Sequence, residues 1–259
     1  MQAQQPIGVF DSGVGGLSIL GALRAELPRE RFVYSSDAGN APYGERGDAF
    51  VAERTLAMVR ELIDEHHVKA IVLACNTATA AAVHLLRERH SDVALIGVEP
   101  ALKPAAALTR TKRVAVIGTR VTLTSAKFRA LHDSLRDQAE FLIQPCDGLA
   151  GAIENFNDDE VANLCRLYLG PLGEWGRREG QIDTLVLGCT HYPFAARQIV
   201  AVVGPDVRLV ETGEPVARQT RRVLEHHGAL NDKGDAHVEF RTTGSLEALR
   251  AASSRWLGL

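Results

Sequence analysis

Short apolar runs rich in β-branched residues alternate with longer amphipathic stretches along the whole chain. Runs such as 70–74 (AIVLA) and 184–188 (TLVLG) are apolar without alternation, as strands covered on both faces are. This strand–helix alternation is typical of α/β proteins with mainly parallel sheets. We expect strands over Ile7–Phe10, Phe32–Ser35, Ala70–Ala74, Ala94–Val98, Val114–Gly118, Phe141–Ile143, Thr184–Gly188, Val207–Val210 and Val238–Phe240, and helices over Phe50–His66, Ala78–His90, Asp159–Arg178 and Glu214–His226.

Two sequence patterns occur twice, in the same order. Residues 68–77 (VKAIVLACNT) are similar to 182–191 (IDTLVLGCTH), and 7–15 (IGVFDSGVG) is more faintly similar to 114–122 (VAVIGTRVT). Parallel strands often have similar apolar sequences. This does not explain why each of the segments 68–77 and 182–191 has a cysteine at the same position after its apolar run. We therefore expect two similar, pseudo-symmetric α/β domains, with a break near Glu99–Pro104 and a return near Val210. The expected domains are 1–98 plus 210–259 and 99–209.

The composition excludes several classes of protein. The chain has 259 residues, 46% hydrophobic and 24% charged, which is typical of a globular protein. A formal net charge of −3 without a basic patch disfavours nucleic acid as a partner. The first residues lack the pattern of a signal peptide, and no apolar run has the length of a membrane span. The four cysteines form no disulfide framework, so we expect a cytoplasmic protein.

Polar residues follow several expected strands at their carboxyl ends. In open parallel sheets, ligands bind at this edge, beside helix N-termini. The shared position therefore predicts a ligand site there. The groups are Asp11-Ser12-Gly13, Asp37 with Pro42-Tyr43-Gly44, Cys75-Asn76-Thr77, Thr119 with Thr122, and Cys189-Thr190-His191.

Cys75 and Cys189 are the strongest candidates for chemistry. A cysteine at a helix N-terminus faces the positive end of the helix dipole, which lowers the thiol pKa. Cys165 lies on an apolar helix face and is expected in the core, and Cys146 precedes a turn and is given no role. A redox pair is an alternative, although a C-x-x-C motif is absent. A metal site at Cys189 and His191 is another, although the sequence indicates no further ligands.

The glycine-rich loop after the first strand, FDSGVGG (10–16), also favours ligand binding. A dinucleotide site is one interpretation, with Asp37 as the acid that binds the ribose. However, Ser18 occupies the place of the third glycine, and Asp11 would repel a pyrophosphate. The loop amides are equally suited to a carboxylate.

Five segments, spread over nearly the whole chain, resemble the bacterial glutamate racemases of the aspartate/glutamate racemase superfamily. They are FDSGVGGLS (10–18), APYG (41–44), ACNTATA (74–80), GVEPALKPA (97–105) and LGCTHYPF (187–194). The resemblance implies a two-domain α/β fold with the active site between the domains. It also implies free glutamate as substrate and neither a cofactor nor a metal. A homodimer is left open.

The resemblance also implies roles for individual residues. Cys75 and Cys189 would be the two bases, assisted by Asp11 and His191, respectively. A loose local match, GAIEN (151–155), adds Glu154 as a catalytic acidic residue. The substrate-binding residues would be Asp11, Ser12, Pro42, Tyr43, Gly44, Asn76, Thr77, Thr119, Thr190 and His191.

Inversion of an α-carbon needs a base on one face and an acid on the other, which two thiols provide if one is ionised. The expected product, D-glutamate, would supply peptidoglycan synthesis. Two alternatives remain at this point. One is an aspartate racemase or another two-cysteine isomerase. The other is a non-catalytic protein of the same fold that binds an amino acid or a partner protein.

Overall fold

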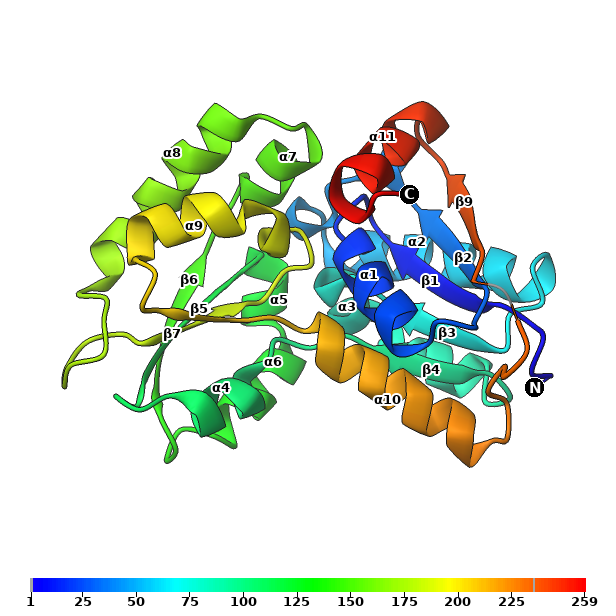
Figure 1. The fold of residues 1–259 in the computed structure, drawn as a ribbon, viewed down its shortest axis with the longest axis horizontal. Helices are drawn as coiled ribbons and strands as arrows, with labels where there is room; N and C mark the ends of the chain where they lie inside the picture. Colours follow the sequence, from blue (N-terminus) through cyan, green and yellow to red (C-terminus); the bar gives the residue numbers. More distant parts are fainter. Residues whose placement is uncertain (1, 235) are drawn as a thin grey trace. The chain divides into compact units, whose positions relative to one another are not determined.

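The computed structural model describes residues 2–234 and 236–259, which form two compact units (Figure 1). Unit 1 contains the residues up to Val98 together with Gly213–Leu259, and unit 2 contains Glu99–Thr212. Each unit has its own sheet, and all strand pairs in both sheets are parallel. Among the described residues, no helix has the length and apolar character needed to span a membrane.

Unit 1 is built on a sheet with the strand order β4-β3-β1-β2-β9. Its strands are β1 (Ile7–Asp11), β2 (Phe32–Ser36), β3 (Ala70–Leu73), β4 (Ala94–Gly97) and β9 (Val238–Thr242). Its α-helices are α1 (Leu17–Glu26), α2 (Asp48–Asp64), α3 (Asn76–Arg89), α10 (Gly213–His226) and α11 (Leu246–Leu257), and two 3₁₀ turns are η1 (Ala38–Asn40) and η2 (Tyr43–Glu45).

Helices cover the sheet of unit 1 on both faces (Figure 1). Helices α2 and α3 contact each other, and α1 contacts α10 and α11. Under α2 and α3 lies a core that includes Phe10 of β1, Leu73 of β3, Leu62 of α2 and Leu86 of α3, all nearly or fully buried. The uninterrupted apolar strands are explained by this two-sided cover, because both faces of each central strand lose contact with water.

Unit 2 is built on a sheet with the strand order β6-β5-β7-β8. Its strands are β5 (Arg113–Gly118), β6 (Glu140–Pro145), β7 (Thr184–Leu187) and β8 (Arg208–Val210). Its α-helices are α4 (Leu102–Leu108), α5 (Arg120–Thr124), α6 (Ala126–Asp133), α7 (Leu149–Glu154), α8 (Asp158–Leu169) and α9 (Ala196–Val203), and two 3₁₀ turns are η3 (Gly170–Leu172) and η4 (Tyr192–Ala195). One core cluster packs Leu102, Val116, Phe128 and Val186 together.

The two sheets repeat one strand order. In unit 1, β1 lies between β2 and β3, and β4 lies outside β3; in unit 2, β5 lies between β6 and β7, and β8 lies outside β7. The strands matched by sequence, β1 with β5 and β3 with β7, therefore occupy equivalent places. The prediction of two similar α/β halves with mainly parallel sheets is confirmed. Strand β9 is an addition at the β2 edge of unit 1.

One expected helix is wrong in its length. The helix predicted over Asp159–Arg178 ends at Leu169, where Gly170 and Pro171 begin the 3₁₀ turn η3. Gly173 then has a φ of +136°, which a residue with a side chain rarely adopts, so the chain cannot continue as a helix. The expected strands are all present, with ends that differ by no more than two residues.

Candidate active site

Asp11, at the end of β1, organises the glycine-rich loop of unit 1. Its side chain is fully buried, and its Oδ2 accepts the backbone N–H groups of Gly13 and Gly16, each at 3.0 Å. A Cβ at Gly16 would lie 2.6 Å from the Cβ of Asp11, so the loop closes around the carboxylate only because this residue is glycine. These two amides are therefore already bonded to Asp11, which disfavours the dinucleotide interpretation of the loop.

Cys75 lies at the N-terminus of a helix, as the sequence predicts. It follows β3 and is the N-cap of α3, where its Sγ accepts the backbone N–H of Ala78 at 3.4 Å. The Oγ of Ser12 lies 3.5 Å from the same sulfur. A thiolate at this position would be stabilised by the helix dipole and by both donors. The structure thus brings Ser12 of the glycine-rich loop to Cys75.

The next residue, Asn76, is a buried amide in the first turn of α3. Neither its Oδ1 nor its Nδ2 has a hydrogen-bond partner in the described residues. A buried polar group without a partner is costly unless a ligand or water satisfies it. Thr77, which follows, is also buried, but the cap of the helix is Cys75 rather than Thr77.

The Pro42-Tyr43-Gly44 segment forms the end of the loop after β2. The Ala41–Pro42 peptide bond is cis, and Tyr43 begins the 3₁₀ turn η2. The ring of Tyr43 is buried against Phe10 and Phe50. Its hydroxyl donates to Asp37 rather than facing the solvent.

In unit 2, Cys189, His191 and Glu154 form a chain of contacts. The Sγ of Cys189 lies 3.7 Å from Nδ1 of His191, and Nε2 of His191 lies 2.6 Å from Oε2 of Glu154. Burial alone would lower the pKa of His191, but the interactions with Cys189 and Glu154 outweigh it and raise the pKa well above its usual value. The imidazole beside the sulfur of Cys189 therefore keeps its proton to a higher pH than an ordinary histidine.

The surroundings of Cys189 differ from those of Cys75. Cys189 precedes the 3₁₀ turn η4, and α9 begins only at Ala196, so the expectation that Cys189 opens an α-helix is wrong. Pro193 lies in the first turn of η4, where a proline is tolerated because its missing N–H would have no partner there. Gly188 holds this segment against β5, since a Cβ there would lie 2.6 Å from the carbonyl oxygen of Ile117.

Thr119 follows β5 as the N-cap of α5. Its Oγ1 accepts the N–H of Thr122 at 3.3 Å and also lies 2.9 Å from the hydroxyl of Thr122. The N-cap of α5 is therefore Thr119, and Thr122 supplies the N–H that it accepts. Thr190, between Cys189 and His191, is buried.

The surroundings of Cys75 in unit 1 and of Cys189 in unit 2 can now be compared with known proteins. Residues 18–220 match the model of the family described as Asp/Glu/Hydantoin racemase. The chain belongs to this racemase family. A glutamate racemase from Ralstonia pickettii is 45% identical to it over 260 residues, which is 99% of this chain and 89% of the relative.

Solved structures of glutamate racemases have the same fold as this racemase-family chain. A Bacillus anthracis isoform has a TM-score of 0.87 at 35% identity, with 100% of this chain and 96% of that chain covered. A Francisella tularensis enzyme in complex with D-glutamate has a TM-score of 0.83 at 28% identity, with 99% and 95% covered. The resemblance that the sequence motifs indicate is thus confirmed at the level of family and fold.

The other two cysteines of this racemase lie in the core, as expected for Cys165. Cys165 is fully buried, and burial raises the pKa of its thiol to about 11. Cys146 is also buried, its thiol pKa is raised mainly by burial, and its sulfur lies 3.6 Å from the carbonyl oxygen of Gln144. Both thiols therefore stay protonated at neutral pH.

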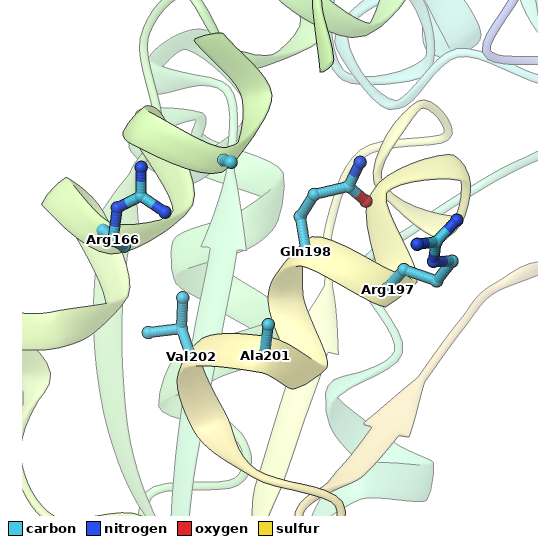
Figure 2. Close-up of a pocket in the computed structure, with 6 residues that line it drawn as sticks. Arg166, Arg197, Gln198, Ala201 and Val202 are labelled. Atoms are coloured by element: carbon cyan, nitrogen blue, oxygen red, sulfur yellow. The ribbon is translucent and has the colours of Figure 1, made fainter. Parts of the chain in front are cut away.

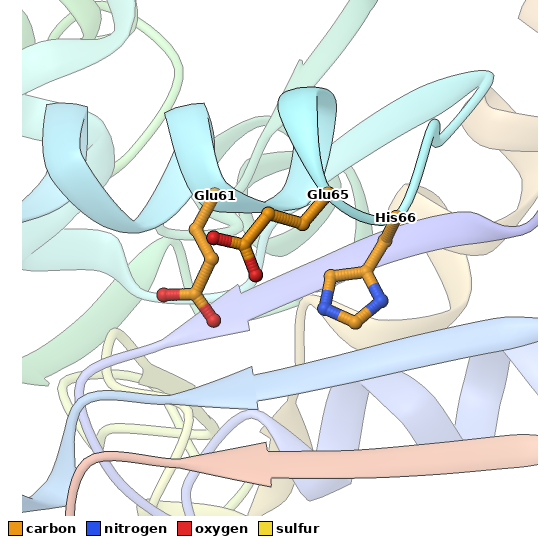
Figure 3. Close-up of side chains that lie close together, drawn as sticks. All are labelled: Glu61, Glu65 and His66. Atoms are coloured by element: carbon orange, nitrogen blue, oxygen red, sulfur yellow. The ribbon is translucent and has the colours of Figure 1, made fainter.

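Two further features of the racemase lie apart from the expected residues. Glu61, Glu65 and His66, at the end of α2, are the one group in the described residues whose side chains are close enough to share a metal ion (Figure 3). Cys189 and His191 belong to no such group of three among the described residues. A pocket of about 240 Å³ between α8 and α9 has Arg166, Arg197 and Gln198 in its lining and contains none of the expected site residues (Figure 2).

Proposed function

We propose that this chain interconverts L- and D-glutamate, with Cys75 and Cys189 as the two acid–base groups. The observation that carries the proposal is the place of the two cysteines. Each follows the corresponding strand, β3 or β7, of two parallel sheets with the same strand order. A fold that repeats a thiol in this way supplies one group of the same chemistry from each half.

The surroundings of the two thiols support the proposed mechanism. Abstraction of the α-proton by a thiolate and reprotonation by a thiol on the opposite face would invert the carbon. The first cysteine would end as a thiol and the second as a thiolate, which is the state needed for the reverse reaction. Hydrogen bonds from Ala78 and Ser12 would stabilise a Cys75 thiolate. In unit 2, the imidazole of His191 lies 3.7 Å from the sulfur of Cys189.

The substrate would be held by buried polar groups near these thiols. The unsatisfied amide of Asn76 fits a carboxylate or an ammonium group, because it offers both a donor and an acceptor. The other groups proposed for binding are Ser12, Pro42, Tyr43, Gly44, Thr77, Thr119, Thr190 and His191, with Asp11 near the ammonium group. We propose that the protein acts in the cytoplasm, where D-glutamate would supply peptidoglycan synthesis.

The test is circular dichroism of the purified protein with L-glutamate and no added cofactor. We expect the signal to decay to zero, with deuterium incorporated at Cα in heavy water. L-aspartate in a parallel reaction tests the alternative of an aspartate racemase. Absence of racemisation with glutamate, or loss of activity after chelation that only a metal restores, would contradict the proposal.

A further inference from the structure

Asp37, which the mechanism does not use, is a fully buried carboxylate bonded by four side chains. Its Oδ2 accepts the hydroxyl of Tyr43 at 2.6 Å and Nε of Arg54 at 2.9 Å. Its Oδ1 accepts the second guanidinium nitrogen of Arg54 at 2.8 Å, Oγ1 of Thr243 at 2.7 Å and Nδ2 of Asn40 at 3.0 Å. The two oxygens together offer about four lone pairs, so these bonds use the whole accepting capacity of the carboxylate.

The four partners come from three parts of unit 1. Asn40 and Tyr43 belong to the loop after β2, Arg54 belongs to α2, and Thr243 directly follows β9. Thr243 reinforces the connection, because its Oγ1 also accepts the N–H of Gly39 at 3.1 Å. Through one carboxylate, the loop is therefore fixed to a helix on one side and to the C-terminal strand on the other.

The charge states of the groups favour this arrangement. Burial raises the pKa of the Asp37 carboxyl, but the hydrogen bonds from its four partners outweigh burial and hold the pKa below its usual value. Burial and the bond to Asp37 both raise the pKa of Tyr43. At neutral pH Asp37 is thus an anion and Tyr43 a phenol, so the Tyr43 hydroxyl donates to Asp37 and is unsuited to act as a base.

We propose that Asp37 is a positioning residue for the substrate-binding loop, acting through Tyr43. The Tyr43 hydroxyl is held by Asp37, and the Tyr43 ring packs against Phe10 and Phe50. Because the whole side chain is held, the backbone of the Pro42-Tyr43-Gly44 segment is held in place with it. This role rests on the proposed function, in which this segment binds glutamate. In this role, Tyr43 fixes the conformation of the loop, and its hydroxyl binds Asp37 rather than the substrate.

The test compares Asp37→Asn, Tyr43→Phe and the double variant. The carboxamide of Asn places an N–H₂ group toward donors, so at least one bond to Tyr43 or Arg54 is lost. We expect KM for glutamate to rise by about tenfold or more in Asp37→Asn, as for loss of one hydrogen bond to a charged group, with a smaller change in kcat. Tyr43→Phe should raise KM less, and the double variant should be no worse than Asp37→Asn.

Hydrogen–deuterium exchange gives a measurement that does not depend on activity. Amides of residues 38–46 should exchange faster in Asp37→Asn, while those of α3 remain unchanged. The matched control is Asp64→Asn, which removes an exposed carboxylate of α2 that pairs with Arg60 and should change neither KM nor exchange. Wild-type protein that fails to racemise glutamate would contradict the proposed function, while the exchange result would still test the positioning of the loop.

Two outcomes would overturn the inference. The first is a folded Asp37→Asn protein in which KM and the amide exchange of residues 38–46 are both unchanged. The second is a double variant whose increase in KM equals the product of the increases in Asp37→Asn and Tyr43→Phe. If Asp37→Asn does not fold, Thr243→Val is the second variant, because it removes one peripheral donor and keeps the branched shape. A folded Thr243→Val protein should show faster exchange of 38–46 and a higher KM, and the absence of both changes would equally overturn the inference.

Discussion

Nε2 of His191 lies 2.6 Å from Oε2 of Glu154, although 37 residues separate them along the chain. The carboxylate of Glu154 thus reaches the imidazole on the side opposite Cys189, whose sulfur faces Nδ1. A histidine with a thiol on one nitrogen and a carboxylate on the other keeps its proton to a higher pH than usual. This relationship leads to the first prediction.

Glu154→Gln should move the basic limb of the pH–rate profile for L-glutamate to lower pH. Burial lowers the pKa of His191, and Glu154 is one of the two groups that raise it. Without this carboxylate the pKa of His191 falls, so the imidazole loses its proton at a lower pH. We expect kcat to fall roughly 10- to 100-fold, less than the upper range for removing an acid–base group itself. Glu140→Gln, which changes an exposed carboxylate paired with Arg113, is the control and should leave the profile unchanged.

Cys75→Ser and Cys189→Ser should each abolish racemisation yet retain a different half-reaction. A glutamate analogue with a leaving group at Cβ eliminates it after removal of one proton, so only one base is needed. From the family resemblance, the Cys189→Ser protein should still process the D enantiomer and Cys75→Ser the L enantiomer. Release of the leaving group measures this. Loss of racemisation in Cys165→Ser as severe as in either variant would be inconsistent with the two-thiol assignment.

Glu30→Gln should destabilise unit 1 without altering the chemistry. Lys69 and Glu30 are both buried, their charged atoms lie 2.6 Å apart, and Nζ of Lys69 also donates to the carbonyl oxygen of Ala229. Neutralising one partner leaves a buried ammonium group without its counter-charge, which costs roughly 3 kcal/mol of unfolding free energy. Urea denaturation measures the change. Asp64→Asn, at an exposed pair with Arg60, should cost less than about 1 kcal/mol.

Gly188→Ala should be destabilising, whereas Gly151→Ala should not. The added Cβ at position 188 would lie 2.6 Å from a backbone oxygen of β5, and backbone cannot move aside as a side chain can. We expect a loss of at least about 2 kcal/mol and a loss of activity, because Cys189 is the next residue. Gly151 lies within α7 with open space at its Cβ, so alanine there should be neutral or stabilising by about 0.5–1 kcal/mol. Equal unfolding midpoints for the two variants would refute the steric argument.

The sequence predicts the strands well because the central ones are covered on both faces and are therefore apolar without interruption. It overextends α8, because apolar residues continue beyond Leu169 while Gly170 and Pro171 end the helix. It also places a helix directly after Cys189, where the structure instead has the 3₁₀ turn η4. At the end of α8, a local backbone constraint overrides the periodic pattern.

Side-chain networks are harder to predict than strands. The contact of Glu154 with His191 is suggested only by a short local similarity, since no periodicity relates α7 to the segment after β7. Arg54 and Thr243 give no sequence signal for their contact with Asp37, and Thr243 is 206 residues away from it. Such contacts depend on how the chain returns to the first sheet, which residue patterns within single elements do not encode.

Strand β9 has a consequence for the synthesis of the protein on the ribosome. Unit 2 is continuous in sequence, but unit 1 needs Gly213–Leu259, which emerge after unit 2. Until β9 pairs with β2, the backbone groups on that side of β2 are unpaired, and an unpaired strand is a site where chains aggregate. Thr243 reaches Asp37 in the same late step. The loop that we propose to bind substrate is thus completed only after translation has passed the second unit.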